Sequence, residues 1–442
     1  MDVYFPGRMA EADLFKQKVG GGLSKSLSKS FVFRFAGLLV VFLLQILLAR
    51  LMKPAHFGDF TIIVTVVNIF LTFSLFGFDS SASRFIPELL AKNDFASVQG
   101  FAKFSYRSVA FIALMCSVAI LVFLIAKSKR FNIGFSEGLF WGLLLIPFLA
   151  SIYQSSAILV AMGRIKTSMV PVYFITPVLM GLGCYYYFYS HQKLSVDAAM
   201  LINLFCTVAV SIFIKGRVKK VLNDVAPADK PSYDRKSWLS VSGILFMPMA
   251  IELLLKQSDI LFVGYFLGNT QAGSYSVAVR LTMFAALGLA ATNQVFLPKV
   301  VAMFESRQWM KMQQLIRNST LQVLSITLPL AFIVLLGGKW ILSLFGSSFS
   351  GAYLPLIILM AGQIINTSMG MAFGLLAIAG YRKTIFILYL LAFSIQIVLN
   401  LLLIPIMGIT GAAIASTLSL LFLNITAYVF VRRKLKIKAS FI

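Results

Sequence analysis

Five charged side chains stand inside long apolar runs, where charges are rare. Arg34, Lys256 and Arg280 are cations, and Glu252 and Asp259 are acids. A charge in apolar surroundings is costly unless it has a partner, so each of these residues indicates a binding or ion-carrying role by default. A guanidinium group there attracts an anion, and its planar fork matches the oxygens of a phosphate.

Lys256 and Arg280 lie on either side of a short polar break centred near Thr270, 14 and 10 residues away from it. At about 1.5 Å per helical residue, both side chains reach a similar depth. Two cations at one depth repel each other unless an anion lies between them. Arg280 has no acidic neighbour in its own run, so we rank it first as an anion-binding residue.

Lys256 has acidic neighbours, which leaves two interpretations open. Glu252 precedes it by four residues, the favourable order for a helical ion pair, and Asp259 follows it by three. One interpretation is a self-neutralised cluster of all three residues. The other keeps Lys256 as a second anion-binding residue and makes Glu252 or Asp259 the carrier of a coupling proton or sodium ion. For Arg34, snorkelling to headgroups and a place in a cavity are both open.

The composition sets the class of protein that must position these residues. Hydrophobic residues make up 59% of the 442, charged residues 12%, and the mean hydropathy is +0.90. Soluble domains usually carry about 25% charged residues, whereas a membrane span needs about 20 apolar residues in a row. We therefore predict an all-α polytopic membrane protein with twelve transmembrane helices, near residues 31–50, 59–78, 106–126, 138–161, 168–188, 196–214, 239–266, 273–297, 318–337, 350–379, 383–404 and 409–431.

The most polar internal segment, Lys215 to Lys236, divides these spans into six and six. The predicted organisation is a cytoplasmic tail at 1–30, an N-terminal six-helix lobe at 31–214, a cytoplasmic linker at 215–237, a C-terminal six-helix lobe at 238–431 and a basic cytoplasmic tail at 432–442. Of the 39 cations, 29 fall on the side of the two ends, 7 on the other side and 3 inside spans. This asymmetry predicts that both ends are cytoplasmic, and it accounts for most of the +24 charge without nucleic acid.

A pattern repeats between the two halves. The hairpin after the first span contains Gly58 and Phe60, and the hairpin after the seventh contains Gly273 and Tyr275, a shift of 273 − 58 = 215 residues. A second pair of similar stretches, "LVAMGRIK" and "LAIAGYRK", is separated by nearly the same number of residues. Six spans return the chain to its starting side. The halves are therefore predicted to be parallel repeats, related by a pseudo-two-fold axis along the membrane normal, that face one another across a central pathway.

Arg84 and Lys299 are related by the same shift and close the second and eighth spans. Each alone is explained by cytoplasmic anchoring. Their symmetric placement adds the possibility that they attract an anionic headgroup at the inner mouth of the pathway.

Five stretches together resemble one known family. They are "LLARLMKPAHFGDF", "FGFDSSASRFIPEL", "KQSDILFVGYFLGNTQAGSYSVAVRL", "LFGSSFSGAYLPLIIL" and "NLLLIPIMGITGAAIAS". Their order along twelve spans resembles the polysaccharide transporter family, which contains the Wzx-type flippases of the multidrug/oligosaccharidyl-lipid/polysaccharide exporter superfamily. The resemblance implies two six-helix bundles around a cavity, and a polyprenyl-pyrophosphate-linked oligosaccharide that is moved to the outer leaflet for O-antigen, capsule or exopolysaccharide synthesis.

The expected protein is thus a flippase of the bacterial inner membrane rather than an enzyme, working by alternating access. Arg280, Lys256, Arg34, Arg84 and Lys299 are its predicted substrate-binding cations, and Glu252 and Asp259 its predicted ion-coupling acids. No cofactor or metal site is expected apart from a coupling proton or sodium ion, because the chain has no nucleotide-binding motif. The expected partners are the lipid-linked glycan, membrane lipids, a glycan polymerase and a chain-length regulator.

Three rival functions remain. A multidrug antiporter of the same superfamily usually carries cations and favours an acidic cavity, whereas the spans here hold three cations against two acids. A flippase of the lipid-linked peptidoglycan precursor shares the superfamily. A membrane glycosyltransferase or glycan polymerase needs catalytic acids and usually a sizeable external loop, and the predicted external loops are short.

Overall fold

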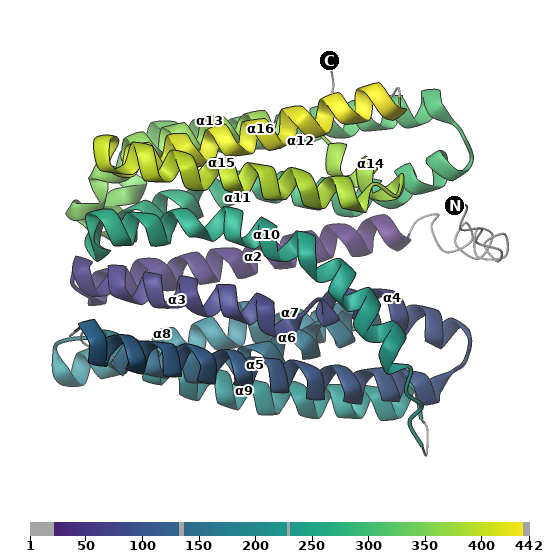
Figure 1. Ribbon diagram of the computed structural model, residues 1–442, viewed down its shortest axis with the longest axis horizontal. Coiled ribbons are helices and arrows are strands. Elements are labelled where there is room, and N and C mark those ends of the chain that lie inside the picture. The colour runs from purple at the N-terminus through teal and green to yellow at the C-terminus, as the bar shows by residue number, and fades with distance from the viewer. Residues whose placement is uncertain (1–21, 132–136, 228–229, 436–442) are drawn as a thin grey trace.

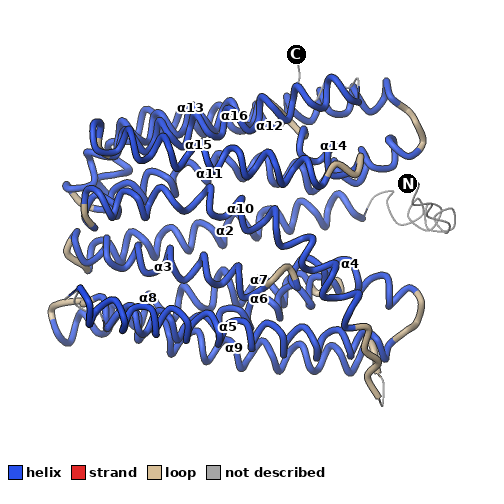
Figure 2. The backbone as a smooth tube through the Cα atoms, in the orientation of Figure 1, coloured by secondary structure: helices blue, strands red, loops and turns tan. Residues whose placement is uncertain are grey.

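The computed structural model describes residues 22–131, 137–227 and 230–435, with side chains for all of these except 22–34, 123–131, 287–288, 290–295 and 298. Every regular element in these ranges is helical (Figure 2). The long helices run roughly side by side along the molecule (Figure 1). We call the end where α2 begins and α16 ends the terminus end, and the opposite end the hairpin end.

The first lobe contains α2 to α9. Its elements are α2 (Gly22–Leu51), α3 (Pro54–Leu75), α4 (Phe78–Ala91), α5 (Phe95–Phe131), α6 (Glu137–Ala161), α7 (Ile165–Val170), the π-helical turn η1 (Pro171–Ile175), α8 (Thr176–His191) and α9 (Val196–Val225).

The second lobe contains α10 to α16. Its elements are α10 (Arg235–Leu267), α11 (Asn269–Glu305), α12 (Trp309–Phe345), the 3₁₀ turn η2 (Ser347–Ala352), α13 (Tyr353–Ser368), α14 (Ala372–Ile378), α15 (Arg382–Met407) and α16 (Ile409–Leu435).

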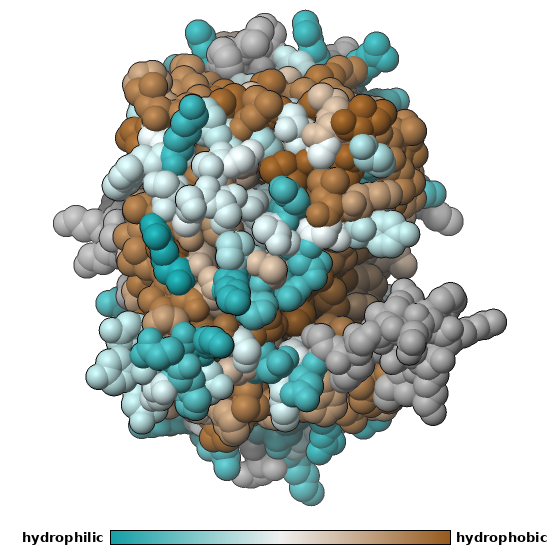
Figure 3. All heavy atoms as spheres, turned by 90° about the vertical axis from the view of Figure 1, so that its left-hand side faces the viewer, coloured by the Kyte–Doolittle hydropathy of each residue, from teal (hydrophilic) through white to brown (hydrophobic). Residues whose placement is uncertain are grey.

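The all-helical membrane fold is confirmed. Ten helical segments of the described chain are long and apolar enough to cross a bilayer, and α2 adds the shorter apolar run Phe35–Leu51. Large apolar side chains such as Phe111, Leu182 and Ile212 stand exposed on the helices, as expected for surfaces that face lipid. Seen from the hairpin end, polar residues gather over the middle of the molecule and apolar residues flank them (Figure 3).

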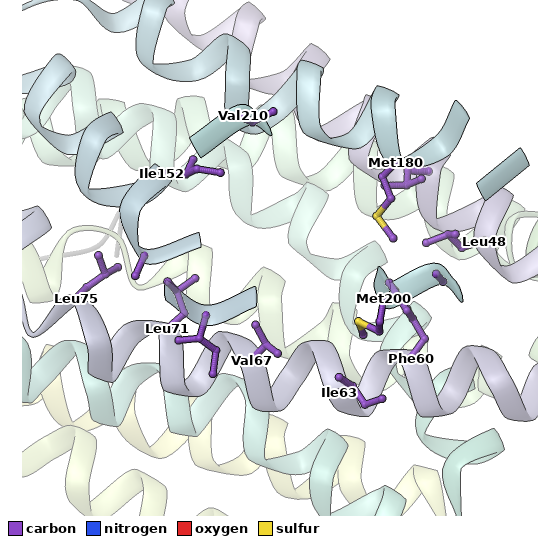
Figure 4. Close-up of a cluster of buried hydrophobic side chains, with 14 of the residues drawn as sticks. Leu48, Phe60, Ile63, Val67, Leu71, Leu75, Ile152, Met180, Met200 and Val210 are labelled. Atoms are coloured by element: carbon purple, nitrogen blue, oxygen red, sulfur yellow. The ribbon is translucent and has the colours of Figure 1, made fainter. Parts of the chain in front are cut away.

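The core of the first lobe forms around α3. Ile63, Val67 and Leu71 of α3 are buried among side chains from α6, α8 and α9, such as Met180 and Met200 (Figure 4). Helix α3 also packs against α10 and α11 of the second lobe. It is therefore a central element through which the two lobes touch.

The helix is interrupted at the end of the second predicted span, 59–78, and within the tenth, 350–379. The second span breaks between α3 and α4, where Phe76 and Gly77 both have positive φ angles of 45° and 73°. A Cβ at Gly77 would collide with the backbone of α10 at Ser242, so glycine is required both for the turn and for the close approach. The tenth span is divided into η2, α13 and α14.

Helix α10 is part of the second lobe but also packs against helices of the first lobe. Its hairpin-end half packs against α15, but its terminus-end half lies across α4, and Trp238 contacts the rings of Phe101 and Phe104 on α5. Figure 1 shows the helix bending between the two halves, and Pro248 lies in its interior. The serine hydroxyls of Ser81 and Ser242 are 2.8 Å apart at this crossing.

The segment predicted as a linker, 215–237, differs from the expectation because α9 continues as a helix to Val225. The remaining connection is fastened to the first lobe. Gln99 Nε2 donates to the carbonyl of Ala226 at 2.9 Å, and the Ser232 amide donates to the carbonyl of Ala96 at 3.0 Å.

Candidate functional site

The two lobes meet closely at the hairpin end. Gly58 on α3 faces Gly273 on α11, and a side chain at Gly58 would collide with the backbone of Asn269. The Asn269 amide donates to the Asp59 carboxylate. These residues are the ones that the repeated hairpin pattern singled out, and the structure brings the two hairpins together.

Arg50 ties the first lobe to the second at the same end. Its Nε donates to the carbonyl of Leu344 at 2.6 Å and its Nη2 to the carbonyl of Ser343 at 2.7 Å. The last carbonyls of a helix have no partner within the helix, so a guanidinium at the end of α12 satisfies them and complements the helix dipole. Arg50 belongs to the seven cations predicted for the side opposite the chain ends, and nothing local in the sequence identifies a partner 294 residues away.

Aromatic rings continue the lobe contact along α2. Phe57 packs edge-on against Phe349 at a centroid distance of 5.6 Å, and Phe42 against Phe345 at 5.4 Å. Phe284 of α11 contacts Phe42 at 5.1 Å and Phe35 at 6.4 Å. The lobe interface therefore presents rings on α2, α11 and α12.

Arg280 lies on α11 one turn before Phe284. It is eleven residues into the helix, about 16 Å from the hairpin end. Its side chain is half-buried, and it forms no hydrogen bond or ion pair with any part of the chain that the structure describes. A guanidinium held away from water without a counter-charge is unfavourable, so this position suits an anionic ligand that supplies the missing partner.

Lys256 is different from Arg280 although both are at similar depth. It is eleven residues before the end of α10, and its Nζ pairs with Glu252 Oε1 at 2.5 Å. The ammonium is therefore neutralised within its own helix. Of the predicted cluster of Glu252, Lys256 and Asp259, only the first two form an ion pair in the structure.

Asp259 instead anchors a buried polar cluster inside the second lobe. The Tyr275 hydroxyl donates to Oδ2 at 2.7 Å, the Ser416 hydroxyl donates to the same oxygen at 2.9 Å, and the Ile260 amide donates to Oδ1 at 2.8 Å. Only 3% of Asp259 is exposed. Three donors and no cation among the described residues surround this carboxylate.

Helix α15, which reaches this cluster through Gln396, carries side-chain amide groups with unpaired atoms. Gln396 donates to the Ser416 hydroxyl at 3.3 Å, but its Oε1 has no partner, and neither amide atom of Asn400 has one in the described structure. Both residues are fully buried on α15. Unpaired oxygens beside a carboxylate can accept a small cation or a proton.

Asn400 and Ser416 begin and end the stretch "NLLLIPIMGITGAAIAS", which was quoted from the sequence for its resemblance to a family. The buried contacts of Ser416, Tyr275 and Gln396 were not predictable from the sequence, because isolated polar residues within apolar helices have no local pattern that identifies their partners.

Arg84 and Lys299 are both exposed, toward the terminus end of their helices. The Arg84 guanidinium lies 5.8 Å from the Phe85 ring centroid, and Lys299 Nζ lies 5.5 Å from that of Phe296. Glu88 pairs with Lys92 at 2.7 Å rather than with Arg84. The side chain of Arg34 lies outside the described residues. Among the described residues, the structure does not bring Arg84 or Lys299 into contact with Arg280, and the assignment of all three cations stays a prediction.

The described chain is thus a two-lobed bundle of membrane-crossing helices, with an unpaired cation one turn from the rings of the lobe interface and a polar cluster inside the second lobe. Comparison with known proteins adds the family. The polysaccharide biosynthesis protein family matches residues 25–304, well over half of the chain. The chain belongs to this family, and the resemblance drawn from the motifs is confirmed.

Curated relatives agree with this assignment. The probable low-salt glycan biosynthesis flippase Agl15 of Haloferax volcanii is 28% identical over 167 residues, 36% of this chain and 34% of its own length. The probable flippase AglR of the same organism is 23% identical over 245 residues, 54% of this chain and 49% of its own. The match spans about a third to a half of the length of these relatives.

Solved structures share the fold across nearly the whole chain. An inward-facing multidrug resistance MATE family transporter of the MOP superfamily has a TM-score of 0.72 at 16% identity, covering 90% of this chain and 94% of that one. The lipid II flippase MurJ in an inward closed conformation has a TM-score of 0.67 at 14% identity, covering 91% and 87%. The predicted two-lobe, twelve-helix fold is thereby confirmed. These relatives and neighbours are transporters and flippases rather than enzymes.

Proposed function

We propose that the chain is a flippase that moves a polyprenyl-pyrophosphate-linked oligosaccharide across the bacterial inner membrane for surface polysaccharide synthesis. The observation that carries this proposal is Arg280, a half-buried guanidinium with no partner in the described chain, one helical turn from Phe284, whose ring contacts Phe42 across the lobe interface. A pyrophosphate supplies two adjacent anionic groups, and arginine binds such oxygens through paired hydrogen bonds. The family membership and the curated relatives support a glycan as the cargo.

Movement would proceed by alternating access. In the proposed orientation both chain ends are cytoplasmic, so the hairpin end faces the outside and is closed by Arg50 and by the pair Gly58 and Gly273. The headgroup would enter from the cytoplasmic side, bind Arg280, and leave outward once these contacts open. Arg84 and Lys299 would raise the local concentration of the anionic headgroup at the entrance, and Arg34 would add binding charge. Lys256 would contribute less, because Glu252 neutralises it.

The energy source in this proposal is an ion gradient. Asp259 is the better of the two acidic candidates because it is buried without a cationic partner among the described residues, whereas Glu252 is paired with Lys256. Binding of a proton or a sodium ion would neutralise the Asp259 carboxylate inside the second lobe. Release of the glycan to a polymerase and a chain-length regulator would consume the product.

A multidrug antiporter is the second candidate, because multidrug transporters are among the structural neighbours. A cationic drug needs an anionic partner between the lobes. The described interface presents Arg280 there instead, and the buried acid lies inside the second lobe. A peptidoglycan-precursor flippase is the third candidate, since it shares both the fold and a pyrophosphate-bearing cargo class with the proposal.

The test is made in the source organism with the gene deleted and glycan polymerisation intact. Lipid-linked repeat units on the inner leaflet and the surface polysaccharide are quantified together. The expected result is accumulation of the former and loss of the latter, with rescue by the intact chain and by Arg317→Ala, an exposed cation of α12, but not by Arg280→Ala. If the deletion strain keeps normal levels of both glycan pools and becomes more sensitive to cationic drugs, drug export replaces glycan transport as the proposed function.

A further inference from the structure

A groove of about 550 Å³ lies within the first lobe, on α5, α6 and α9. Helix α6 packs against both α5 and α9, and the groove lies between these two helices over α6. Helices α5 and α9 run along the edge of the molecule farthest from the second lobe (Figure 1). The groove is therefore separate from the lobe interface and from Arg280.

The groove has one cationic end. Lys103 of α5 and Lys215 and Lys219 of α9 line it. Counted from the terminus-end limits of their helices, they lie between about 9 and 15 Å along the helix axis. All three are exposed, and none forms a hydrogen bond or ion pair with the part of the chain that the structure describes.

No carboxylate lines the groove among the described residues. Lys215 and Lys219 are one helical turn apart, where like charges repel. An anion bound between the three ammonium groups removes this repulsion and gains their combined attraction.

The other end of the groove is apolar. Val109 and Ala110 on α5 and Pro147 and Phe148 on α6 form it. Val109 and Pro147 each lie about 21 Å from the terminus-end limit of their helix, which is deeper in the membrane than the lysines. Cations at the membrane surface joined to an apolar channel inside the membrane match the two parts of one phospholipid molecule.

We propose that this groove binds one anionic glycerophospholipid of the leaflet at the terminus end. Its phosphate group lies between Lys103, Lys215 and Lys219, and one acyl chain follows Val109, Ala110 and Phe148. A net negative lipid is favoured over a zwitterionic one, because the lysines bring three positive charges and the lining brings no negative charge.

A lipid bound in this groove would also affect the structure of the first lobe. Gln99, at the cationic end, donates to the carbonyl of Ala226, which follows α9 in the connection to α10. A lipid bound there holds α5, α9 and this connection together. The bound state therefore stabilises the first lobe and the anchor of α10 on it.

The experiment uses the full chain, purified in neutral detergent and depleted of lipid. Native mass spectrometry measures binding of phosphatidylglycerol and of phosphatidylcholine to three proteins: the wild type, the groove variant Lys103→Gln/Lys215→Gln/Lys219→Gln, and the control Arg217→Gln/Lys220→Gln/Lys236→Gln. The control removes the same charge from neighbouring exposed positions that do not line the groove.

The expected result is a tighter phosphatidylglycerol complex for wild type and control. Each groove lysine should contribute about a fivefold factor, so the triple groove variant should bind on the order of 100-fold more weakly. Binding should also weaken as salt is raised. Equal binding by the groove variant and the control, or equal binding of both lipids by the wild type, would overturn the proposal.

A second variant tests the apolar end without touching the charges. Ala110→Trp places an indole in the groove at an exposed position, where it displaces the acyl chain but not a folded neighbour. It should lose phosphatidylglycerol retention, and retention at the wild-type level would contradict the acyl-chain site. Arg280→Ala should bind the lipid as the wild type does, which separates this proposal from the flippase proposal.

Discussion

Gly58 of α3 and Gly273 of α11 face each other across the lobe interface, at equivalent positions of two repeated hairpins. The backbones approach so closely that neither position has room for a side chain without a shift of its neighbour. The two hairpins that the pseudo-two-fold relation makes equivalent therefore touch each other at the hairpin end. A larger residue at this point should act on the lobe contact rather than on the fold of either lobe.

The first prediction concerns this contact. Gly58→Leu should force α3 and α11 apart at the hairpin end and lower stability by about 1–3 kcal/mol, as overpacking does. Thermal unfolding in detergent measures the loss. Gly216→Ala is the matched control: it lies on α9 with open space around it, and should be neutral or stabilise by up to about 1 kcal/mol. A destabilisation as large at Gly216 as at Gly58 would show that close packing is not the cause.

The second prediction concerns Arg50. Arg50→Ala should remove both hydrogen bonds to the end of α12 and weaken closure at the hairpin end by about 1 kcal/mol. Electron–electron distance measurement between spin labels at Ala55 and Ser348, both exposed, should show a larger share of the separated form. Lys53→Gln, an exposed cation nearby, should leave the distance distribution as in the wild type. An unchanged distribution for Arg50→Ala would mean that the other contacts alone hold the lobes together.

The third prediction separates binding from stability at Arg280. Arg280→Ala should reduce transport about tenfold or more, because a charge-assisted pair with the cargo is lost. The empty protein should keep or raise its melting temperature, because an unpaired cation is removed from a half-buried position. Arg280→Lys should recover transport in part, since it keeps the charge but not the planar fork. A large fall in melting temperature on Arg280→Ala would show instead that the residue supports the fold.

The fourth prediction concerns the coupling ion. If sodium binds beside Asp259, adding sodium chloride should raise the melting temperature of the wild type more than the same concentration of choline chloride, by the usual linkage of binding to stability. Asp259→Asn should abolish the difference, and Glu252→Gln should retain it. If neither salt differs, transport under imposed pH gradients decides for the proton. Indifference of transport to both gradients would remove Asp259 from the mechanism.

The fifth prediction concerns pH and the beginning of α5. Asp94 Oδ1 accepts the Ser97 amide at 3.0 Å and caps the helix, and the hydrogen bonds to Ser97 lower the pKa of this carboxyl below its ordinary value of 3.8. A lowered pKa adds stability at neutral pH that disappears as the pH falls below about 3.8. Asp94→Ala should cost about 1 kcal/mol at pH 7 and much less near pH 3. Asp94→Asn keeps a side-chain oxygen at the same position but has no titrating group, so its stability relative to Asp94→Ala should not change between pH 7 and pH 3; an unchanged difference between wild type and Asp94→Ala over this range would contradict the prediction.

The membrane fold and the repeat were predictable from the sequence because both depend on patterns of neighbouring residues. Apolar run length predicts helices that span a bilayer, and the repeated Gly-x-aromatic element predicted equivalent hairpins. That Gly58 touches Gly273 was not predictable, because a repeat relation does not say which equivalent elements meet.

Within the site, the sequence predicted the partner of a side chain only where that partner lies one helical turn away. The pairing of Lys256 with Glu252 was expected from their spacing and is observed. Asp259, three residues further on, turns instead toward Tyr275 and Ser416, and the second of these lies 157 residues away. Such partners depend on how α10, α11 and α16 pack, which no local pattern encodes.

Helix α10 crosses from one lobe to the other, and this limits how the halves can move. Its first turns are held on α4 and α5 by Trp238 and the connection before it, while its last turns are held on α15. Two rigid six-helix blocks therefore cannot swing freely past one another. Any movement of one lobe against the other must bend α10, and Pro248 marks the place in this helix where bending costs least, because proline removes a backbone hydrogen bond there.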